Sequence, residues 1–423
     1  MNRPFPVMLV DIRAKTSQPG FWEYFRPNFR SKTMDFVDLA AQQRRIRKTI
    51  EEKIQAVLSH GQYIMGPEIK QLEERLAEYV GVEHAIGCAS GTDALLLALM
   101  AYQIGPGDAI FTTPFTFIST AEVISLLGAT PVFVDIDPFT FNMDPKKLEQ
   151  AIKALKIDDP FLHPLPKHDT PLSPRGIIPV DLFGLPADYR EINAIAEKYD
   201  LFVIQDAAQS FGAEYQGKKT CGLANIGCAS FFPAKPLGCY GDGGMCFTDN
   251  DHLAQLVQSF RVHGKGDHKY DNVRIGINGR LDTLQAAILL AKFDIFPEEV
   301  ELRQQVAQRY SSYLNNLTCP VVIPSVPENN TSVWAQYSVL AKNEKHRSEL
   351  QSKLKKADVP TAVYYPMSLH LQTAFSYLGY QKGDFSVSED CSHRIFSIPM
   401  HPYLQREDQK RIAMVILSGD AGD

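Results

Sequence analysis

Apolar residues follow a helical spacing near the start of the chain, but only after a first segment without a regular pattern. Residues 1–33 mix basic and acidic side chains without sustained periodicity, so we expect them to form a poorly ordered extension. From Met34 onward, apolar residues that recur every three or four positions predict an amphipathic helix that stops at His60. A second pattern of this kind covers residues 68–79 and ends at Gly81. The folded chain is therefore predicted to begin near Met34.

Between residues 84 and 250, short runs that are apolar on both faces alternate with helical segments. Strands buried on both faces are typical of sheets that helices cover on both sides. The expected strands are 84–88, 109–112, 131–134, 176–180, 201–205, 227–232 and 244–248, and the helices between them include 92–102 and 189–198. The pattern predicts an α/β core with a parallel or mixed sheet. Ligands of such sheets bind at the carboxyl ends of the strands, so the residues after each strand are the first to search.

The pattern changes after this core. Two long helical segments follow Arg280, and beyond about residue 315 shorter strands and helices with turn signals predict a smaller α+β domain. We therefore expect three parts: the extension 1–33, a large domain 34–300 that includes the N-terminal helices 34–80, and a small C-terminal domain 301–423. Residues 157–175 hold five prolines and little periodicity, which predicts a surface insertion.

Composition excludes several classes of protein. The 43 Lys and Arg residues against 49 Asp and Glu residues give a net charge of −6, which argues against nucleic acid as a partner. The apolar runs are far shorter than the roughly 20 residues that cross a membrane, and the N-terminus has no recognisable secretory signal. The seven cysteines lack the spacing of a metal site or a disulfide framework, so we expect a cytoplasmic protein with no metal.

The first segment with candidate chemistry is Ser90-Gly91-Thr92-Asp93, which follows a predicted strand and opens a predicted helix. A glycine at such a turn lets backbone N–H groups approach an anion, and the helix N-terminus adds favourable partial charge. The segment is suited to bind a phosphate. Taken alone, it is better explained as an ordinary helix cap in which Asp93 complements the helix dipole.

The second segment places Asp206 at the end of a buried strand, with Gln209 three residues later. Burial disfavours the charged form of a carboxylate, so Asp206 needs a cation or hydrogen-bond donors. A pyridinium N–H of a ligand would serve, and Gln209 could reach a neighbouring ring oxygen. The plain alternative is an aspartate that caps the next turn.

The third and fourth segments carry an amine and a pair of phosphate-binding side chains. Lys235 lies in an apolar loop bounded by prolines and glycines, where a lowered pKa would favour Schiff-base chemistry, because the neutral amine is the form that attacks a carbonyl. The alternative is a loop lysine that reaches to solvent. Residues 274–280 supply Asn278 and Arg280, which are suited to phosphate oxygens unless the loop simply faces water.

These four segments resemble, in sequence and order, the sugar aminotransferases of the DegT/StrS family, which depend on pyridoxal 5'-phosphate (PLP). The resemblance covers nearly the whole chain from Met34. It includes the segments 60–68, 90–92, 113–117, 134–137, 206–210, 230–244 and 278–282. It implies the fold-type I, aspartate aminotransferase-like architecture, with a mostly parallel sheet in the large domain and a smaller α+β C-terminal domain.

The resemblance also implies a role for each matched residue. Lys235 would bond covalently to PLP, Asp206 would pair with the pyridine nitrogen, and these two are the expected catalytic residues. The expected cofactor contacts are Gly91, Thr92 and Ser230 at the phosphate, Phe117 stacked on the ring, Gln209 at the ring hydroxyl, Asp206, Lys235, and Asn278 from the second subunit of a homodimer. Arg280, Tyr364 and Tyr365 are expected at the substrate, and no metal ligands are expected.

The sequence of these segments most resembles that of enzymes that aminate a UDP-linked 2-acetamido-2-deoxy-3-oxo-glucuronate on the way to bacterial surface polysaccharide such as O-antigen. The implied reaction moves the amino group of L-glutamate to that nucleotide sugar. Those enzymes carry His-Tyr-Pro where this chain has Tyr364-Tyr365-Pro366, and tyrosine cannot carry a positive charge at neutral pH. The alternative substrate is a 4-keto-6-deoxy-sugar nucleotide.

Three other functions remain open at this point. A dehydratase of the same family has histidine in place of Lys235, so the lysine argues against that chemistry. A lyase or desulfurase could use Cys239 or Cys246, although cysteines are commonly small buried hydrophobes. A non-catalytic nucleotide-sugar-binding or regulatory protein would require loss of the lysine, and Lys235 is present.

Overall fold

The computed structural model describes residues 34–268, 270–315 and 319–418, so the predicted extension 1–33 lies outside the described residues. The chain from Asp35 onward forms one compact unit. The boundary predicted at residue 300 falls inside helix α9 (Phe296–Leu314), and the division into a large and a small domain stays a prediction. No helix in the described ranges has both the length and the apolar character that crossing a membrane requires.

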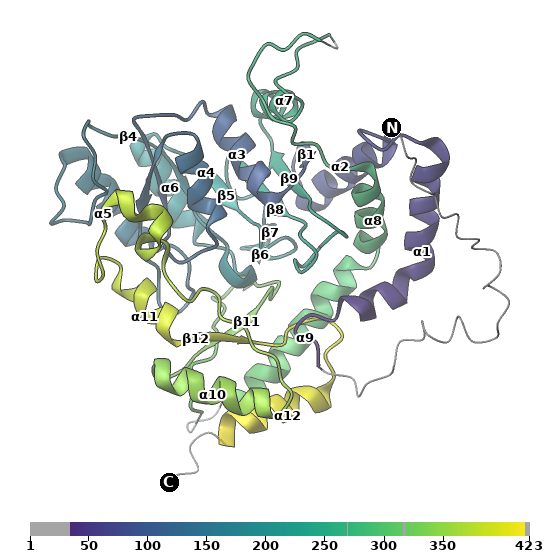
Figure 1. Ribbon diagram of the computed structural model, residues 1–423, viewed down its shortest axis with the longest axis vertical. Coiled ribbons are helices and arrows are strands. Elements are labelled where there is room, and N and C mark those ends of the chain that lie inside the picture. The colour runs from purple at the N-terminus through teal and green to yellow at the C-terminus, as the bar shows by residue number, and fades with distance from the viewer. Residues whose placement is uncertain (1–33, 269, 316–318, 419–423) are drawn as a thin grey trace, which may run out of the picture. The chain divides into compact units, whose positions relative to one another are not determined.

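The two predicted N-terminal helices are α1 (Leu39–His60) and α2 (Pro67–Val80). Each ends where the sequence placed its stop, at a glycine in the left-handed region: Gly61 has φ +70° and Gly81 has φ +83°. Both helices pack against α8 (Thr283–Phe293), as Figure 1 shows. Helix α8 contributes Gln285 to a cavity that also contains Asn278 and Arg280, so this packing helps to position that cavity.

The core is a seven-stranded mixed sheet with the strand order β1-β9-β8-β5-β4-β2-β3. Its strands are β1 (His84–Cys88), β2 (Asp108–Thr112), β3 (Thr130–Phe133), β4 (Ser173–Ile178), β5 (Phe202–Asp206), β8 (Ile226–Ser230) and β9 (Gly244–Thr248). Strands β2 to β5 and β8 are parallel neighbours, and β9 runs antiparallel between β8 and β1. Six strands thus end at the same edge, which confirms the predicted α/β fold.

Helices cover both faces of this sheet because its strands are apolar on both sides (Figure 1). On β5, Ile204 packs with side chains of α3 (Gly91–Ala101), α4 (Ser119–Leu126) and α7 (Asp251–Phe260). Its neighbour Val203 packs on the other face with α5 (Pro145–Ile157) and α6 (Tyr189–Tyr199). The strand ends are therefore held between two buried layers.

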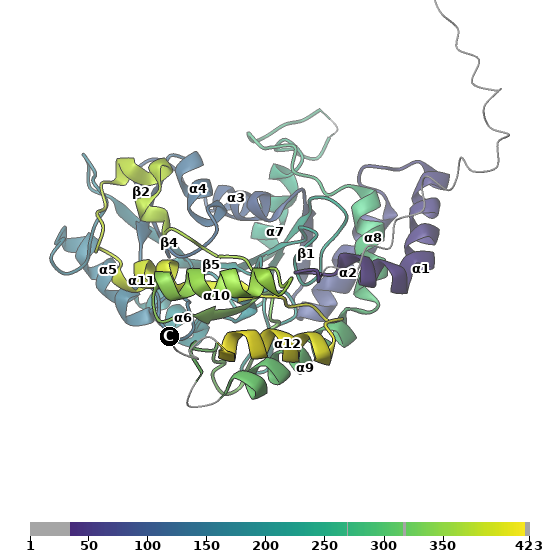
Figure 2. The ribbon, with the colours of Figure 1, turned by 60° about the horizontal axis from the view of Figure 1, so that its bottom comes forward.

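The C-terminal part has the predicted shorter strands and helices. After α9 come β11 (Tyr337–Leu340), α10 (Glu344–Lys356), α11 (Ser386–Arg394), β12 (Ile395–Ile398) and α12 (Arg406–Leu417), with 3-10 turns at Leu369–Leu371 and Thr373–Leu378. Strands β11 and β12 form an antiparallel pair, and α12 lies along α9 (Figure 2). A small sheet joins β10 (Asn330–Thr331), β6 (Glu214–Tyr215) and β7 (Lys218–Lys219).

The predicted surface insertion 157–175 is wrong at both ends. Ile157 is the last residue of α5, and Ser173 to Arg175 belong to β4, which pairs with β2. Pro174 misled the pattern, because a proline cannot donate to a ladder; the strand accommodates it at an irregularity in the β2 register. Within the insertion His163 is buried and its Nε2 lies 2.8 Å from the carbonyl oxygen of Phe133 on the edge strand β3.

Candidate active site

A cavity of about 640 Å³ lies at the carboxyl ends of β5 and β8. It brings together most of the predicted residues, which come from seven different places in the chain. Those that line it are Gly91, Thr92, Phe117, Asp206, Gln209, Ser230, Lys235, Tyr364 and Tyr365. A second cavity, of about 700 Å³ beside Asp144 and Arg190, contains none of them. The residues that the strand-end rule singled out thus lie together in one cavity, which is not the cavity of the largest volume.

Asp206 ends β5 and is only 3% exposed. Its Oδ2 accepts a hydrogen bond of 2.7 Å from the Thr120 hydroxyl, and its Oδ1 accepts one of 3.2 Å from the Ala208 N–H. Burial raises the pKa of Asp206 above its ordinary value, while Thr120, Ala208 and the charge of Lys235 lower it. The carboxylate is thus buried at a cost that a cationic ligand group in the cavity would offset.

Lys235 faces the same cavity from the loop after β8. The backbone N–H of Lys235 donates a 2.8 Å hydrogen bond to the Phe232 carbonyl, so the residue lies on a tight turn. Burial lowers the pKa of Lys235, against the opposing attraction of Asp206. A lowered pKa increases the neutral fraction of the amine, which is the nucleophilic form.

The N-terminus of α3 forms the wall next to Ser230. Ser90 caps the helix, because its hydroxyl accepts a 3.0 Å hydrogen bond from the Asp93 N–H. A Cβ added at Gly91 would lie only 2.6 Å from the Cβ of Ser230, so only glycine lets the helix start this close to β8. The first helical residues Gly91 and Thr92 therefore line the cavity beside the Ser230 side chain, in the arrangement that suits an anion.

Gln209, Tyr365 and Phe117 form the opposite side of the cavity. The Gln209 side chain accepts a 2.8 Å hydrogen bond from the Phe183 N–H and donates one of 3.2 Å to the Tyr365 hydroxyl. The Phe117 ring lies 6.4 Å from the Tyr365 ring and is 53% exposed. An exposed aromatic face beside two buried polar groups is suited to cover a flat ligand ring.

Asn278 and Arg280 lie elsewhere. They line a neighbouring cavity of about 400 Å³, together with Ile64, and Asp242 lines both cavities. The Arg280 Nε is buried and has no hydrogen-bond partner among the residues that the structure describes. One chain therefore does not bring Asn278 to the Lys235 cavity, and its expected contact through a second subunit stays a prediction. The expected contact of Arg280 with the substrate likewise stays a prediction.

Sequence reasoning missed two groups that shape the site. Thr120 holds Asp206 from α4, and no local pattern linked these residues, which are 86 positions apart. Asp181 is fully buried and accepts hydrogen bonds from Gln205 and Ser210, at 2.7 and 2.6 Å, on either side of the turn that carries Asp206 and Gln209. Burial raises the pKa of Asp181 to about 6. An aspartate just after a buried strand was the available signal for it.

A family model described as the DegT/DnrJ/EryC1/StrS aminotransferase family matches residues 44–417. The chain belongs to this family. The family resemblance noted on the motifs is thus confirmed over almost the whole described chain.

Known relatives carry both enzymatic and regulatory names. The UDP-2-acetamido-2-deoxy-3-oxo-D-glucuronate aminotransferase of Pseudomonas aeruginosa is 48% identical over 90% of this chain and 99% of the relative. A pleiotropic regulatory protein of Geobacillus stearothermophilus is 40% identical over 89% and 95%. The UDP-N-acetyl-3-dehydro-alpha-D-glucosamine 3-aminotransferase of Acidithiobacillus ferrooxidans is 38% identical over 90% and 96%.

Solved structures agree with the fold and the cofactor. A DegT/DnrJ/EryC1/StrS aminotransferase from Brucella abortus superposes with a TM-score of 0.86 at 47% identity, covering 92% of this chain and all of the other. NtdA from Bacillus subtilis with bound cofactor PMP, the pyridoxamine form of PLP, gives a TM-score of 0.81 at 29% identity over 94% and 87%. The predicted fold-type I architecture, the aminotransferase activity and PLP as cofactor are confirmed.

The cavity has the shape and chemistry that PLP requires. Asp206 is buried and forms no ion pair with the residues that the structure describes, so it suits a pyridine N–H, and the lowered pKa of Lys235 suits reaction with an aldehyde. The close approach of α3 to Ser230, which any side chain larger than glycine at position 91 would block, provides an anion site. The group of three or more His, Cys, Asp or Glu side chains that a metal ion needs is absent from the described residues.

Proposed function

We propose that the enzyme transfers the amino group of L-glutamate to the 3-keto group of a UDP-2-acetamido-2-deoxy-hexuronate, in the biosynthesis of bacterial surface polysaccharide such as O-antigen. The observation that best supports this proposal is that Lys235 and Asp206 line one cavity, beside a helix N-terminus that begins with a glycine. The 3-position is supported by the names of the Pseudomonas and Acidithiobacillus relatives. Seven cysteines that are free in the structure support the cytoplasm as the place of reaction.

The residues that would hold PLP have separate tasks. Bound PLP supplies an electron sink and carries the amino group between the two substrates. Gly91, Thr92 and Ser230 would bind its phosphate, and Phe117 and Gln209 would hold its ring. Asp206, fixed by Thr120, would keep the pyridine nitrogen protonated. Lys235 would bind the cofactor covalently when no substrate is present, and would move a proton at the substrate carbon once released.

The substrate side of the cavity is lined by two tyrosines, of which Tyr365 is fixed by Gln209. Tyr364 packs edge-on against the Phe36 ring with 6.3 Å between centroids. Lys235 is the only lysine or arginine among the residues that line the cavity. A sugar diphosphate and carboxylates need further cations, and Arg280 in the neighbouring cavity is the candidate that we propose.

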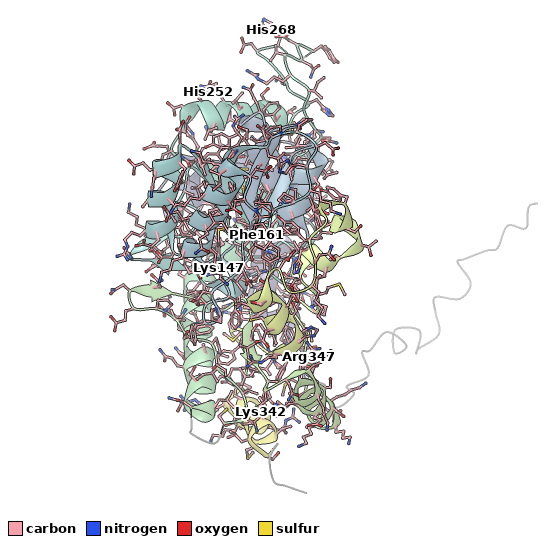
Figure 3. The ribbon with its side chains drawn as sticks, turned by 90° about the vertical axis from the view of Figure 1, so that its left-hand side faces the viewer. Lys147, Phe161, His252, His268, Lys342 and Arg347 are labelled. Carbon is pink, nitrogen blue, oxygen red and sulfur yellow. The ribbon has the colours of Figure 1, made fainter. Side chains whose placement is uncertain are left out.

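We propose a homodimer with shared sites to bring those groups together. The neighbouring cavity is flanked by exposed apolar residues, Tyr63, Ile64, Met65 and Tyr240, and the loop that carries His268 projects from the end of α7 (Figure 3). A second copy is the occupant that would cover this apolar surface and add Asn278 to the site.

The dimer can be tested by placing a charge in this surface. Ile64 is 51% exposed, so Ile64→Asp should leave the fold intact but shift the protein to monomers and lower kcat at least about tenfold, because a buried unpaired charge opposes association. Sedimentation velocity measures the mass. The control is Leu126→Asp on α4, a 70% exposed residue of another surface, which should change neither quantity. A wild-type monomer with full activity would contradict the proposal.

The phosphate cradle gives a second prediction. Gly91→Ala should weaken PLP binding at least about tenfold, since the added Cβ would collide with Ser230 and displace the N-terminus of α3. Titration of the cofactor absorbance measures the dissociation constant. Gly105→Ala is the matched control, because the nearest atom to a Cβ at Gly105 is 4.0 Å away, and its affinity should equal that of the wild type. Equal PLP affinity of both variants would show that the phosphate binds elsewhere.

A regulatory function is the second candidate, and the name of the Geobacillus relative favours it. The deciding experiment offers the enzyme L-glutamate with a UDP-linked 3-keto uronate, and separately with a 4-keto-6-deoxy-sugar nucleotide, and measures the amino sugar formed. The proposal expects amination of the 3-keto substrate with a kcat/KM at least about tenfold higher. A preference for the 4-keto sugar would overturn the position of transfer, and amination of neither sugar would favour regulation.

A further inference from the structure

The loop that presents Lys235 has little regular structure of its own. It connects β8 to β9 and contains Pro233 and Pro236, whose nitrogens cannot donate hydrogen bonds. It is closed on itself, because the Lys235 N–H donates to Phe232 and the Cys239 N–H donates to Phe231, both at 2.8 Å. These bonds shape the loop, but they do not determine where the loop stands relative to the sheet and helices.

Helix α8 supplies two side chains that hold the end of this loop. The Gln285 Oε1 accepts a 2.9 Å hydrogen bond from the Tyr240 N–H. Two helical turns further on, the Lys292 ammonium donates a 2.6 Å hydrogen bond to the Gly238 carbonyl and lies 4.3 Å from the centre of the Tyr240 ring. Residues seven positions apart share one helix face, so both supports come from the same side of α8.

Lys292 is unusual because it is only 1% exposed. Burial lowers its pKa to about 8, against the opposing effects of Cys239 and Glu299. Burying an ammonium group costs free energy that an apolar side chain of similar size would not cost. The hydrogen bond of Lys292 to the loop therefore explains why a lysine stands at this position. The pKa of Lys235 depends on burial and on Asp206. Lys292 therefore bears on the position of Lys235 and not on its charge.

We propose that Lys292 is a positioning residue, which holds the Gly238 carbonyl from α8 and thereby fixes the loop that presents the Lys235 amine to the cavity. The contact is made next to the turn that carries Lys235, since a Cβ added at Gly238 would lie 2.5 Å from the Pro233 carbonyl oxygen and 2.6 Å from that of Phe232. A change in the position of Gly238 therefore acts directly on this turn. The inference rests on the proposed function only for the chemical task of Lys235.

The test compares Lys292→Met, which keeps an unbranched side chain one atom shorter and removes the donor, with Lys292→Gln, which keeps a donor. Gln409→Met is the matched control, because Gln409 is also fully buried and, besides accepting from Arg309, donates to a backbone carbonyl, that of Val306, away from the cavity. Hydrogen exchange followed by mass spectrometry reports the amides of Lys235, Cys239 and Tyr240 in the full chain as purified. A second readout is the fraction of Lys235 that borohydride fixes to added PLP in a set time.

We expect Lys292→Met to raise exchange in residues 232–240 and to slow labelling of Lys235, each by about tenfold, while α9 is unchanged. Lys292→Gln should fall between Lys292→Met and the wild type. Gln409→Met should leave both quantities at the wild-type level. If Lys292→Met does not fold, a loop-specific increase in Lys292→Gln carries the same conclusion.

Exchange and labelling that equal the wild type in both Lys292 variants would overturn the inference, as would an increase spread evenly over the chain. The proposed function fails separately. If wild-type Lys235 takes up no PLP but Lys292→Met still loosens residues 232–240, the loop contact is supported and the function is not.

Discussion

Replacing Lys235 with alanine should lower the kcat of amination by about 10⁴-fold, the largest effect we expect from any single change. Among the described residues, Lys235 is the only lysine that lines the cavity with Asp206, and its removal takes away both the covalent anchor for the cofactor and the proton carrier. Single-turnover amination with L-glutamate as donor measures the effect. The fold should not suffer, because burial already disfavours the charged form of this side chain.

The matched control for this change is Lys153→Ala. Lys153 lies on α5, where it pairs with Glu149 at 3.2 Å, and it lines neither of the two neighbouring cavities. Its removal should leave kcat within about twofold of the wild type, because an exposed ion pair contributes little. Retention of more than a tenth of the activity in Lys235→Ala would show that another amine performs the chemistry.

Replacing Asp206 with asparagine should lower kcat by about 10³-fold and, in the protein without cofactor, should leave stability equal or higher. Asparagine keeps the shape but cannot carry the negative charge that keeps a pyridine nitrogen protonated. Burial raises the pKa of Asp206, so its folded-state pKa lies above the unfolded value near 3.9. The charge therefore opposes folding at neutral pH, and this cost shrinks as pH falls through the raised pKa.

Thermal unfolding of the cofactor-free protein at several pH values checks the second half of this prediction. The difference in the free energy of unfolding between the wild type and Asp206→Asn should disappear at acid pH. Asp144→Asn is the control: Asp144 caps α5 through the N–H groups of Lys146 and Lys147, and asparagine caps equally well, so activity and stability should stay unchanged. An Asp206→Asn enzyme with normal kcat would remove Asp206 from the mechanism.

The part of the fold that sequence predicts well is the part that local patterns encode. Runs apolar on both faces identified the seven strands of the core sheet but not the short β6 and β7, and Gly61 and Gly81 identified the ends of α1 and α2. The rule that ligands bind at strand ends pointed to Asp206, and the family resemblance then joined Asp206 and Lys235 in one site. Both steps depend on residues that are close together in the sequence, so they can be made from the sequence alone.

The part that sequence could not predict depends on contacts between distant segments. Thr120 reaches Asp206 across 86 residues and Lys292 reaches Gly238 across 54, and neither pair has a local signature. The fold alone determines that Asn278 and Arg280 open into a separate cavity. Pro174 shows the opposite error, because a strong local signal for a loop was overridden by pairing of β4 with β2.

The central claim is that Lys235 is the amine that carries the cofactor, and one measurement tests it most directly. Purified protein with bound PLP is reduced with borohydride, digested, and its peptides are mapped by mass spectrometry. We expect the mass of the reduced cofactor on the peptide that contains Lys235, and its loss when L-glutamate is added before the reduction. The cofactor mass on any other lysine, such as the buried Lys292, or on no peptide at all, would contradict the account.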